Sequence, residues 1–296
     1  MRTAFIDQLM EEAAKNEKIF LLVGDLGFSV IEKFAALFPD RYLNVGIAEQ
    51  NMTGIAAGLA MEGYTVFTYS IGNFPTLRCM EQIRYDVCYH NLDVKIVAVG
   101  GGFAYASLGP SHHATEELGM LRTIPGITIA APGDPKEARL VTSMLANTYG
   151  PAYIRLGKAG EPIVHQNLEH IKVGAPLTVI KGTGKAVFTT GAMLKYANDF
   201  IINNKLNWGL YSFPIIKPFD KEALHQVALQ YSEIVTMEEH QLSAGFGSAI
   251  LEVMNDLVQD GTIQSLPLIK RIGIPDKFIS FAGTQDYIRQ KVGLVL

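Results

Sequence analysis

The chain has 296 residues, of which 48% are hydrophobic and 18% are charged. This length and composition support the buried cores of about two domains and exclude a disordered chain. The formal net charge of −4 and a pI near 6.0 argue against a nucleic-acid partner and against an anionic-membrane partner.

We expect neither a signal peptide nor a membrane span from the sequence. The segment 1–8 does not combine basic residues with an apolar run, as a signal peptide would. No uncharged apolar run reaches the roughly 20 residues that a membrane span needs. The two cysteines, Cys79 and Cys88, form no metal or disulfide pattern. We therefore expect a cytoplasmic protein, and the mean hydropathy of +0.17 favours a large buried interface.

The first half alternates short apolar runs with helical patterns, which is typical of a parallel α/β sheet. A helix is predicted from about Ala48 to Met61, because apolar residues recur there at helical spacing. A second helix is predicted to open at Asp134, where Pro135 and Glu137 complete an N-terminal capping pattern. The predicted strands are residues 19–23, 64–69, 94–99, 127–131 and 152–156.

A junction rich in glycine, proline and polar residues spans about 157–176, and the alternation then restarts. The predicted strands of the second half are residues 186–190, 210–213, 234–237 and 268–272. The sequence thus predicts an α/β protein with two doubly wound domains. The first covers residues 1–160 and has a parallel sheet, a linker covers 161–175, and the second α/β domain covers 176–296.

One candidate for chemistry is Glu49, in the segment Asn44–Met52. This segment places a carboxylate where a strand or loop leads into the amino end of a helix. The simplest interpretation is an acidic residue of the first turn that complements the helix dipole.

A second candidate is the segment Gly109–Glu117, which contains Ser111 and the adjacent His112 and His113. It is predicted to form a loop between a strand and a helix, and ligands bind at the carboxyl ends of strands in such sheets. The alternative is a pair of surface histidines. A metal site is disfavoured, because no other cysteine or histidine has suitable spacing.

Segments in order along nearly the whole chain resemble transketolases and 1-deoxyxylulose-5-phosphate synthases. They are residues 38–50, 109–113, 121–127, 131–132, 216–220, 235–240 and 273–278. The resemblance implies a thiamin-diphosphate-binding pyrimidine (Pyr) domain followed by a transketolase C-terminal domain.

The same resemblance implies roles for individual residues. Glu49 would activate the cofactor through N1′ of its aminopyrimidine ring, and Gln50 would lie beside it. Phe74 would stack on that ring, the alternative being ordinary core packing. His112, next to Ser111, would contact the hydroxyl or oxyanion of the bound donor and assist proton transfer.

The family's Gly-Asp-Gly motif for Mg²⁺ and diphosphate is missing. The nearest string, Gly24-Asp25-Leu26-Gly27, has leucine at the third position and reads as a turn at a strand end. We therefore expect a separate N-terminal, diphosphate-binding transketolase subunit to hold most of the cofactor and the Mg²⁺. The resemblance implies a heterotetramer with two copies of each subunit.

The substrate contacts also depart from the family. Leu108 replaces an acidic residue, and Gly100–Gly102 lies where the family has a basic one. Lys158 aligns with the arginine that grips a phosphate, and lysine holds phosphate only as a point charge. Arg155 is either a further substrate contact or a structural residue. These differences favour a modified, unphosphorylated or larger sugar, or another 2-oxo acid donor.

Three functions remain open. The first is a transferase subunit that moves a two-carbon ketol unit between sugars and is active only with its partner. The second is half of a decarboxylating enzyme, similar to 1-deoxyxylulose-5-phosphate synthase or to the β subunit of 2-oxo acid dehydrogenases. The third is a non-catalytic scaffold, against which the presence of both Glu49 and His112 argues. Residues 238–240, at a strand end, are expected to pack against another subunit.

Overall fold

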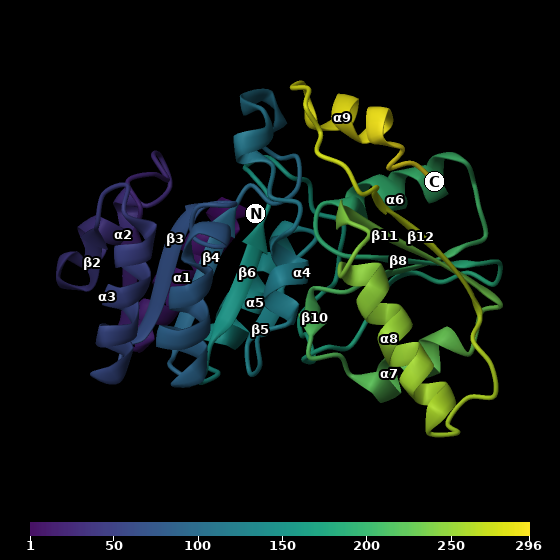
Figure 1. Cartoon of the computed structure of the whole chain (residues 1–296), viewed down its shortest axis with the longest axis horizontal. Coiled ribbons are helices and arrows are strands. Elements are labelled where there is room, and N and C mark those ends of the chain that lie inside the picture. Colours follow the sequence, from purple (N-terminus) through teal and green to yellow (C-terminus); the bar gives the residue numbers. More distant parts are fainter.

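Two α/β units lie side by side in the computed structural model, which describes all residues from 1 to 296 (Figure 1). The first sheet has seven strands in the order β10-β5-β6-β4-β3-β1-β2, and the second has five in the order β12-β11-β8-β9-β7. The predicted α/β fold is confirmed. Each sheet is mixed, because one of its strands runs antiparallel to its neighbour.

Helices cover both faces of the first sheet, so its central strands are almost wholly buried. One face packs on α1 and α5, and the other packs on α3, α4 and a π-helical segment. The strands are β1 (Ile19–Val23), β2 (Tyr42–Asn44), β3 (Thr65–Ile71), β4 (Val94–Val99), β5 (Thr128–Ala130), β6 (Ala152–Leu156) and β10 (Ile215–Lys217). The helices are α1 (Arg2–Lys15), α2 (Glu32–Leu37), α3 (Glu49–Met61), α4 (Glu117–Arg122) and α5 (Pro135–Ala146), with the π-helix at Gln82–Tyr89 and 3-10 turns at Pro39–Arg41, Leu77–Cys79, Ala106–Leu108 and Pro110–His112.

The second sheet is also covered on both faces. Helices α6 and α9 lie on one side of it, and α7 and α8 lie on the other (Figure 1). Its strands are β7 (Leu177–Ile180), β8 (Ala186–Thr189), β9 (Gly209–Ser212), β11 (Glu233–Gln241) and β12 (Leu268–Ile274). Its helices are α6 (Met193–Asn203), α7 (Lys221–Ala228), α8 (Phe246–Gln259) and α9 (Gln285–Val292).

Strand β10 comes from the second half of the chain but completes the first sheet. Ile215 pairs with Ala130 of β5 in the antiparallel sense. The side chain of Lys217 reinforces the junction, because its Nζ donates to the carbonyl oxygen of Arg122 at 2.8 Å. The two halves are therefore joined through a shared sheet, in addition to the linker at 161–175.

The capping pattern predicted at Asp134 is present, and it also anchors the linker. Asp134 Oδ1 accepts a hydrogen bond from the backbone of Glu137 at 2.8 Å. The other oxygen, Oδ2, accepts from the backbone nitrogens of Val164 and His165, both at 2.9 Å. His165 in turn lies 2.7 Å from Glu137, between Nε2 and Oε1. The linker is thus fixed against the amino end of α5.

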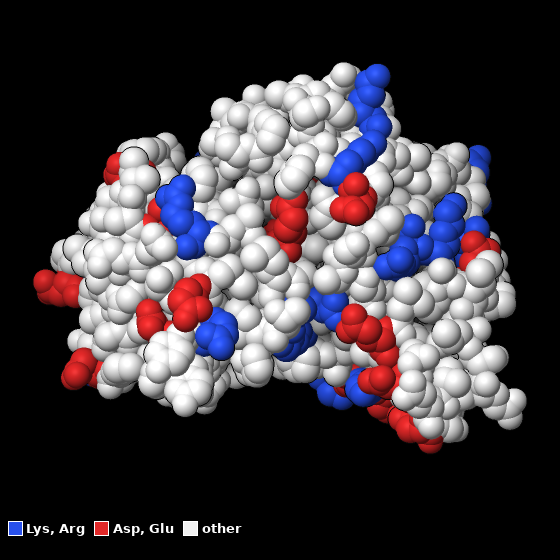
Figure 2. Space-filling model, viewed as in Figure 1, with Lys and Arg blue, Asp and Glu red and all other residues white.

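Figure 2 shows charged side chains of both signs on one face of the molecule. On the face shown in Figure 2, acidic and basic side chains are interspersed, and no continuous basic field is visible. That face does not offer the basic stripe by which proteins follow a phosphate backbone. No helix combines the length and apolarity that crossing a membrane requires.

Candidate active site

Glu49 is the first residue of α3, and its carboxylate points into the protein. The residue is only 1% exposed, and its Oε1 accepts a hydrogen bond from Ser70 Oγ at 3.0 Å. Ser70 lies near the carboxyl end of β3. The turn after β1 closes over the same oxygen, since a Cβ on Gly24 would lie 3.5 Å from it. Glu49 is therefore more than a surface acid at a helix dipole, because it is a buried carboxylate at the carboxyl edge of the sheet.

Arg78 holds the second oxygen of this carboxylate. Its Nη1 donates to Glu49 Oε2 at 3.0 Å, and its side chain is 48% exposed. The guanidinium carbon also lies 5.0 Å from the centroid of the Phe74 ring, which is the geometry of a cation–π contact. Arg78 was not among the residues predicted from the sequence, although its position four residues after Phe74, in a turn that follows β3, was a usable signal.

Phe74 and His112, which the sequence suggested separately as site residues, lie in contact with each other. Their ring centroids are 5.5 Å apart and their planes cross at 72°, so the edge of one ring meets the face of the other. Glu49, Arg78, Phe74 and His112 thus form a continuous row of contacts. The segments Asn44–Met52 and Gly109–Glu117 therefore contribute to a single site.

The loop that carries His112 is held by several backbone contacts. Asn73 Nδ2 donates to the carbonyl oxygen of His113 at 2.5 Å. Gly102 and Ala114 form an isolated antiparallel bridge, and Arg155 Nη2 donates to the Ala114 carbonyl at 2.6 Å. These contacts fix the residues immediately after His112, so the imidazole is presented from a rigid backbone.

The two adjacent histidines have different environments. His112 is half-buried, and its Nδ1 lies 3.0 Å from Ser111 Oγ. His113 is 6% exposed, packs edge-on against Phe103, and has a pKa lowered by burial. Only His112 is available to a ligand. His113 is a residue of the core.

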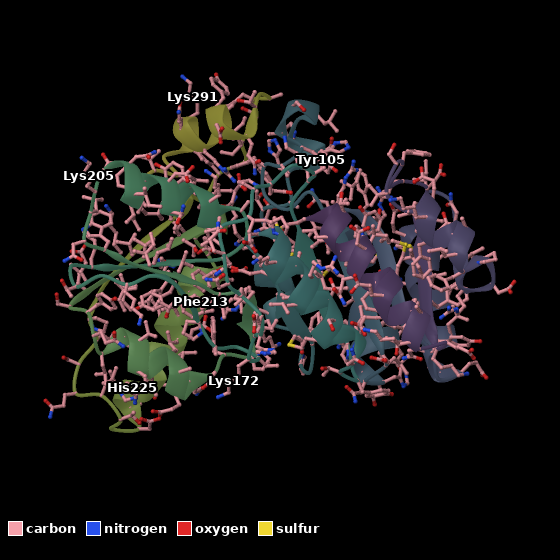
Figure 3. The ribbon with its side chains drawn as sticks, turned by 180° about the vertical axis from the view of Figure 1, so that it is seen from behind. Tyr105, Lys172, Lys205, Phe213, His225 and Lys291 are labelled. Atoms are coloured by element: carbon pink, nitrogen blue, oxygen red, sulfur yellow. The ribbon has the colours of Figure 1, made fainter.

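Gly100–Gly102, where the family has a basic residue, leaves no room for a side chain. Gly100 has φ +90°, and a Cβ there would lie 2.2 Å from the ring of Tyr105, which Figure 3 labels. A Cβ on Gly101 would lie 2.3 Å from Arg155 Nε, and one on Gly102 would lie 2.6 Å from Glu239 Oε2. Glycine at these positions therefore allows the chain to turn sharply after β4, where neighbouring side chains lie too close to admit a Cβ.

The remaining predicted contacts lie apart from this row. Arg155 is 5% exposed, and protein groups occupy its guanidinium. Lys158 is exposed at the rim of a cavity of about 360 Å³ that also contains Lys195 and Arg289. Gln50 is exposed and makes no side-chain hydrogen bond within the chain. A substrate role for Arg155 and Lys158 and a cofactor role for Gln50 stay predictions.

Residues 238–240 are buried inside the chain, so the expectation that they pack against another subunit is wrong. Glu238 accepts hydrogen bonds from the backbone nitrogens of Phe246 and Gly247 at the start of α8. Glu239 forms a two-pronged ion pair with Arg289 at 2.9 and 3.0 Å. All three side chains are at most 3% exposed, and His240 Nε2 accepts a hydrogen bond from the backbone nitrogen of Gly119 in the first half of the chain at 3.2 Å.

Known proteins match the whole chain. Residues 1–160 match the transketolase pyrimidine-binding domain, and residues 178–285 match the transketolase C-terminal domain. An apulose-4-phosphate transketolase subunit of Phocaeicola vulgatus is 32% identical over 290 residues, which cover 96% of this chain and 90% of that protein. The 6-deoxy-6-sulfo-D-fructose transketolase subunit SqwH of Clostridium sp. is 30% identical, over 99% of this chain and 90% of that protein.

A solved structure described as a split gene transketolase, an inactive beta4 tetramer, superposes with a TM-score of 0.86. It is 31% identical to this chain, and the superposition covers 99% of this chain and 93% of that one. The resemblance found in the sequence is thereby confirmed. The chain belongs to the thiamin-diphosphate-dependent transketolase family, of which it carries the pyrimidine-binding and C-terminal domains, as a subunit of split transketolase type.

Proposed function

We propose that this chain is the half of a ketol transferase that binds and activates the aminopyrimidine of thiamin diphosphate, and that the diphosphate is bound by a separate subunit. The observation that carries the proposal is the buried carboxylate of Glu49, held by Ser70 and lying one side chain away from Phe74. An acid and an aromatic ring at the carboxyl edge of a parallel sheet are the groups that an aminopyrimidine requires. The residues present therefore fit that half of the cofactor.

Glu49 would hold a proton at N1′ of the aminopyrimidine, and Ser70 would keep the carboxyl group oriented. Phe74 would support the face of the ring, and the exposed Gln50 would lie at its edge. When bound, thiamin diphosphate supplies the nucleophilic carbon that accepts the two-carbon unit. The role of the chain is to set the protonation and the orientation of the cofactor.

His112 would bind the hydroxyl or developing oxyanion of the donor sugar. Its Nδ1 lies against Ser111 Oγ, so Nε2 is the nitrogen free to meet a ligand. Its edge-on contact with Phe74 ties its position to that of the aminopyrimidine. A donor bound at His112 would therefore be held beside the ring that Glu49 activates.

The diphosphate and Mg²⁺ are assigned to the partner chain. The only string similar to the family motif, Gly24-Asp25-Leu26-Gly27, forms a turn in which Asp25 Oδ1 accepts a hydrogen bond from Asn44 Nδ2 at 2.9 Å. That carboxylate is thus partnered within the chain. The two relatives named as transketolase subunits support a two-subunit enzyme, and we propose two copies of each chain in the assembly.

The substrate is proposed to be a modified sugar. The tight packing around Gly100–Gly102 leaves no place for the family's basic residue, and protein carbonyl groups occupy the buried guanidinium of Arg155. Lys158, on the rim of its cavity, is a cation that an anionic group could reach. The names of the relatives, which refer to apulose 4-phosphate and to a sulfonated fructose, support a sugar with an unusual skeleton or substituent.

The test is to co-purify the chain with its diphosphate-binding subunit and to assay ketol transfer from hydroxypyruvate, with Mg²⁺ and thiamin diphosphate. Glu49→Gln should lower kcat by roughly 10²–10⁴-fold, or about 3–5 kcal/mol of transition-state stabilisation. Glu62→Gln is the matched control, because Glu62 is an exposed residue that caps the other end of α3. Its activity should be unchanged.

Four outcomes would contradict the proposal. A fully active Glu49→Gln variant would remove Glu49 from the chemistry. Turnover of pyruvate without ketol transfer would favour the decarboxylating alternative. Full activity of this chain alone would overturn the division of the cofactor between two subunits, whereas inactivity of every combination would favour the scaffold.

A further inference from the structure

One side chain covers both groups that are assigned to the aminopyrimidine. Arg78 Nη1 lies 3.0 Å from Glu49 Oε2, and the Arg78 guanidinium carbon lies 5.0 Å from the centroid of the Phe74 ring. Arg78 therefore contacts both groups at once. It pairs with the carboxylate oxygen that would face N1′, and it covers the aromatic ring that would support the pyrimidine.

We propose that Arg78 is a further residue of the cofactor site, which competes with the aminopyrimidine for Glu49 and Phe74 and swings into solvent when the cofactor binds. The inference rests on the proposed function, since it takes Glu49 and Phe74 as cofactor contacts. It adds a residue to which no role was assigned, and it makes cofactor affinity depend on that residue.

The two oxygens of Glu49 are not equivalent. Oε1 is held by Ser70, whose hydroxyl is buried at the end of β3. Oε2 has Arg78 as its one hydrogen-bond partner. A buried carboxylate oxygen without a partner is costly, so an empty site needs a group such as Arg78. A cofactor nitrogen at Oε2 would take over that contact and release the guanidinium.

The guanidinium can leave at small cost. Arg78 is 48% exposed, while Glu49 is 1% exposed, so the cation already borders on water. When the guanidinium moves away, water solvates its charge and the cofactor nitrogen takes its place at Glu49 Oε2, so the buried oxygen is not left without a partner. In addition, only one planar group can stack on a given face of the Phe74 ring. The guanidinium and the pyrimidine therefore exclude each other at Phe74.

The expected effect follows from competition. If Arg78 occupies the site for most of the time, the apparent dissociation constant is the intrinsic one divided by the fraction of open sites. Removing the guanidinium should therefore tighten cofactor binding, by roughly 3–30-fold if the open fraction is about 3–30%. The same removal leaves Glu49 Oε2 without its partner, so the empty chain should lose thermal stability. If Arg78 competes with the cofactor, its removal tightens cofactor binding and lowers thermal stability. If its role is purely structural, its removal lowers thermal stability without tightening cofactor binding.

Arg84 provides a matched control. It lies six residues further along the chain, in the π-helix Gln82–Tyr89, is 64% exposed, and pairs with Glu81 at 3.6 Å. Neither Glu49 nor Phe74 is among its partners. Arg84→Gln makes the same change of charge and size as Arg78→Gln, and it should leave cofactor affinity unaltered.

The experiment is a calorimetric titration of thiamin diphosphate, with Mg²⁺, into the complex of this chain with its diphosphate-binding subunit. We expect Arg78→Gln to bind about 3–30-fold more tightly than the natural complex, and Arg84→Gln to match the natural complex. Arg78→Lys should fall between them, because a lysine can pair with Glu49 but covers Phe74 less completely. It also tests the inference if Arg78→Gln does not fold.

The failures of the two proposals can be told apart. If the natural complex binds the cofactor and Arg78→Gln binds equally or more weakly, Arg78 is not a competitor, while the proposed function stands. If neither complex binds the cofactor, the proposed function fails and the inference fails with it. Binding by Arg78→Gln alone would support both.

Discussion

Arg155 donates a hydrogen bond to the carbonyl oxygen of Ala114, two residues beyond His112, at 2.6 Å. The same nitrogen, Nη2, donates to the carbonyl oxygen of Glu239 at 2.9 Å. One buried side chain therefore joins the loop of the candidate donor site to the C-terminal half. That half contributes no group to the row from Glu49 to His112, but it supports the loop on which the row ends.

Replacing Arg155 should destabilise the protein. Arg155 Nε lies 2.9 Å from Glu117 Oε1, and both residues are at most 5% exposed. Arg155→Met would leave the Glu117 carboxyl group buried without its cation, at a cost of about 3–5 kcal/mol in the free energy of unfolding. Urea unfolding measures this. Arg139→Met, which breaks an exposed pair with Glu11, should cost less than about 1 kcal/mol. Equal losses in the two variants would contradict the interpretation.

Asn73→Ala should weaken donor binding and leave cofactor binding intact. Its amide holds the carbonyl of His113 at 2.5 Å and makes no contact with Glu49. Without that hydrogen bond, the loop that carries His112 should loosen and kcat/KM for the donor should fall roughly 10-fold, which corresponds to about 1.4 kcal/mol. Steady-state kinetics and cofactor titration of the same variant separate the two effects.

The control for that measurement is Asn207→Ala, which removes an exposed hydrogen bond to Thr183 in the other half of the chain. Its kinetics should equal those of the natural protein. A cofactor affinity that falls in step with kcat/KM in Asn73→Ala would show that Asn73 acts on the whole site.

Restoring a basic residue at Gly100 should damage the fold instead of improving phosphate binding. Gly100→Lys would combine a left-handed backbone with a Cβ 2.2 Å from the ring of Tyr105. Thermal unfolding should show a loss of more than about 3 kcal/mol. Gly126 has φ +77° but no neighbour within 4 Å of its Cβ position, so Gly126→Ala should cost only about 1 kcal/mol. A stable Gly100→Lys protein would refute the packing argument.

His240 should make stability depend on pH below about 6.5. Burial lowers the pKa of His240 to about 4, and the neutral ring accepts from the backbone of Gly119 and lies 2.8 Å from the carbonyl of Gln241. Between these two pH values the unfolded chain binds a proton that the folded chain does not. The stability contributed by neutral His240 is therefore complete above about pH 6.5 and is lost as the pH falls toward about 4.

The measurement is the difference in unfolding free energy between the natural protein and His240→Gln. This difference should shrink by about 1.4 kcal/mol for each pH unit between about pH 6 and 5. Glu238, whose Oε2 lies 3.8 Å from His240 Nδ1, contributes the opposite slope in both proteins, because burial raises its pKa to about 7. His170→Gln, at an exposed position, should show no such trend.

The sequence predicted the long, regular elements well. The strands expected at 19–23, 94–99 and 152–156 have the bounds of β1, β4 and β6, because each is a mainly apolar run buried on both faces. Two of the three-residue strands, β2 and β10, escaped prediction, whereas β5 was predicted at 127–131. The three residues of β2 and of β10 are too few for any periodicity, and only the edge of a distant strand determines that they pair.

The site shows the same limit. Motif resemblance led to Glu49, Phe74 and His112, and the structure places Phe74 against His112. It did not lead to Arg78, because an exposed arginine in a turn has no pattern of its own. Only the tertiary contact with Glu49 identifies Arg78 as part of the site. Likewise, the burial of Arg155 depends on groups more than 30 residues away.

The pairing of β10 with β5 bears on how the chain folds during synthesis. The other six strands of the first sheet are complete by Leu156, but the exposed edge of β5 has to wait for Ile215–Lys217 to leave the ribosome. An open strand edge is a template for pairing with other chains. The edge of β5 would therefore be open to pairing with other chains in a nascent chain that stalls, or in a product truncated between residues 156 and 215. In the finished protein, β10 covers that edge.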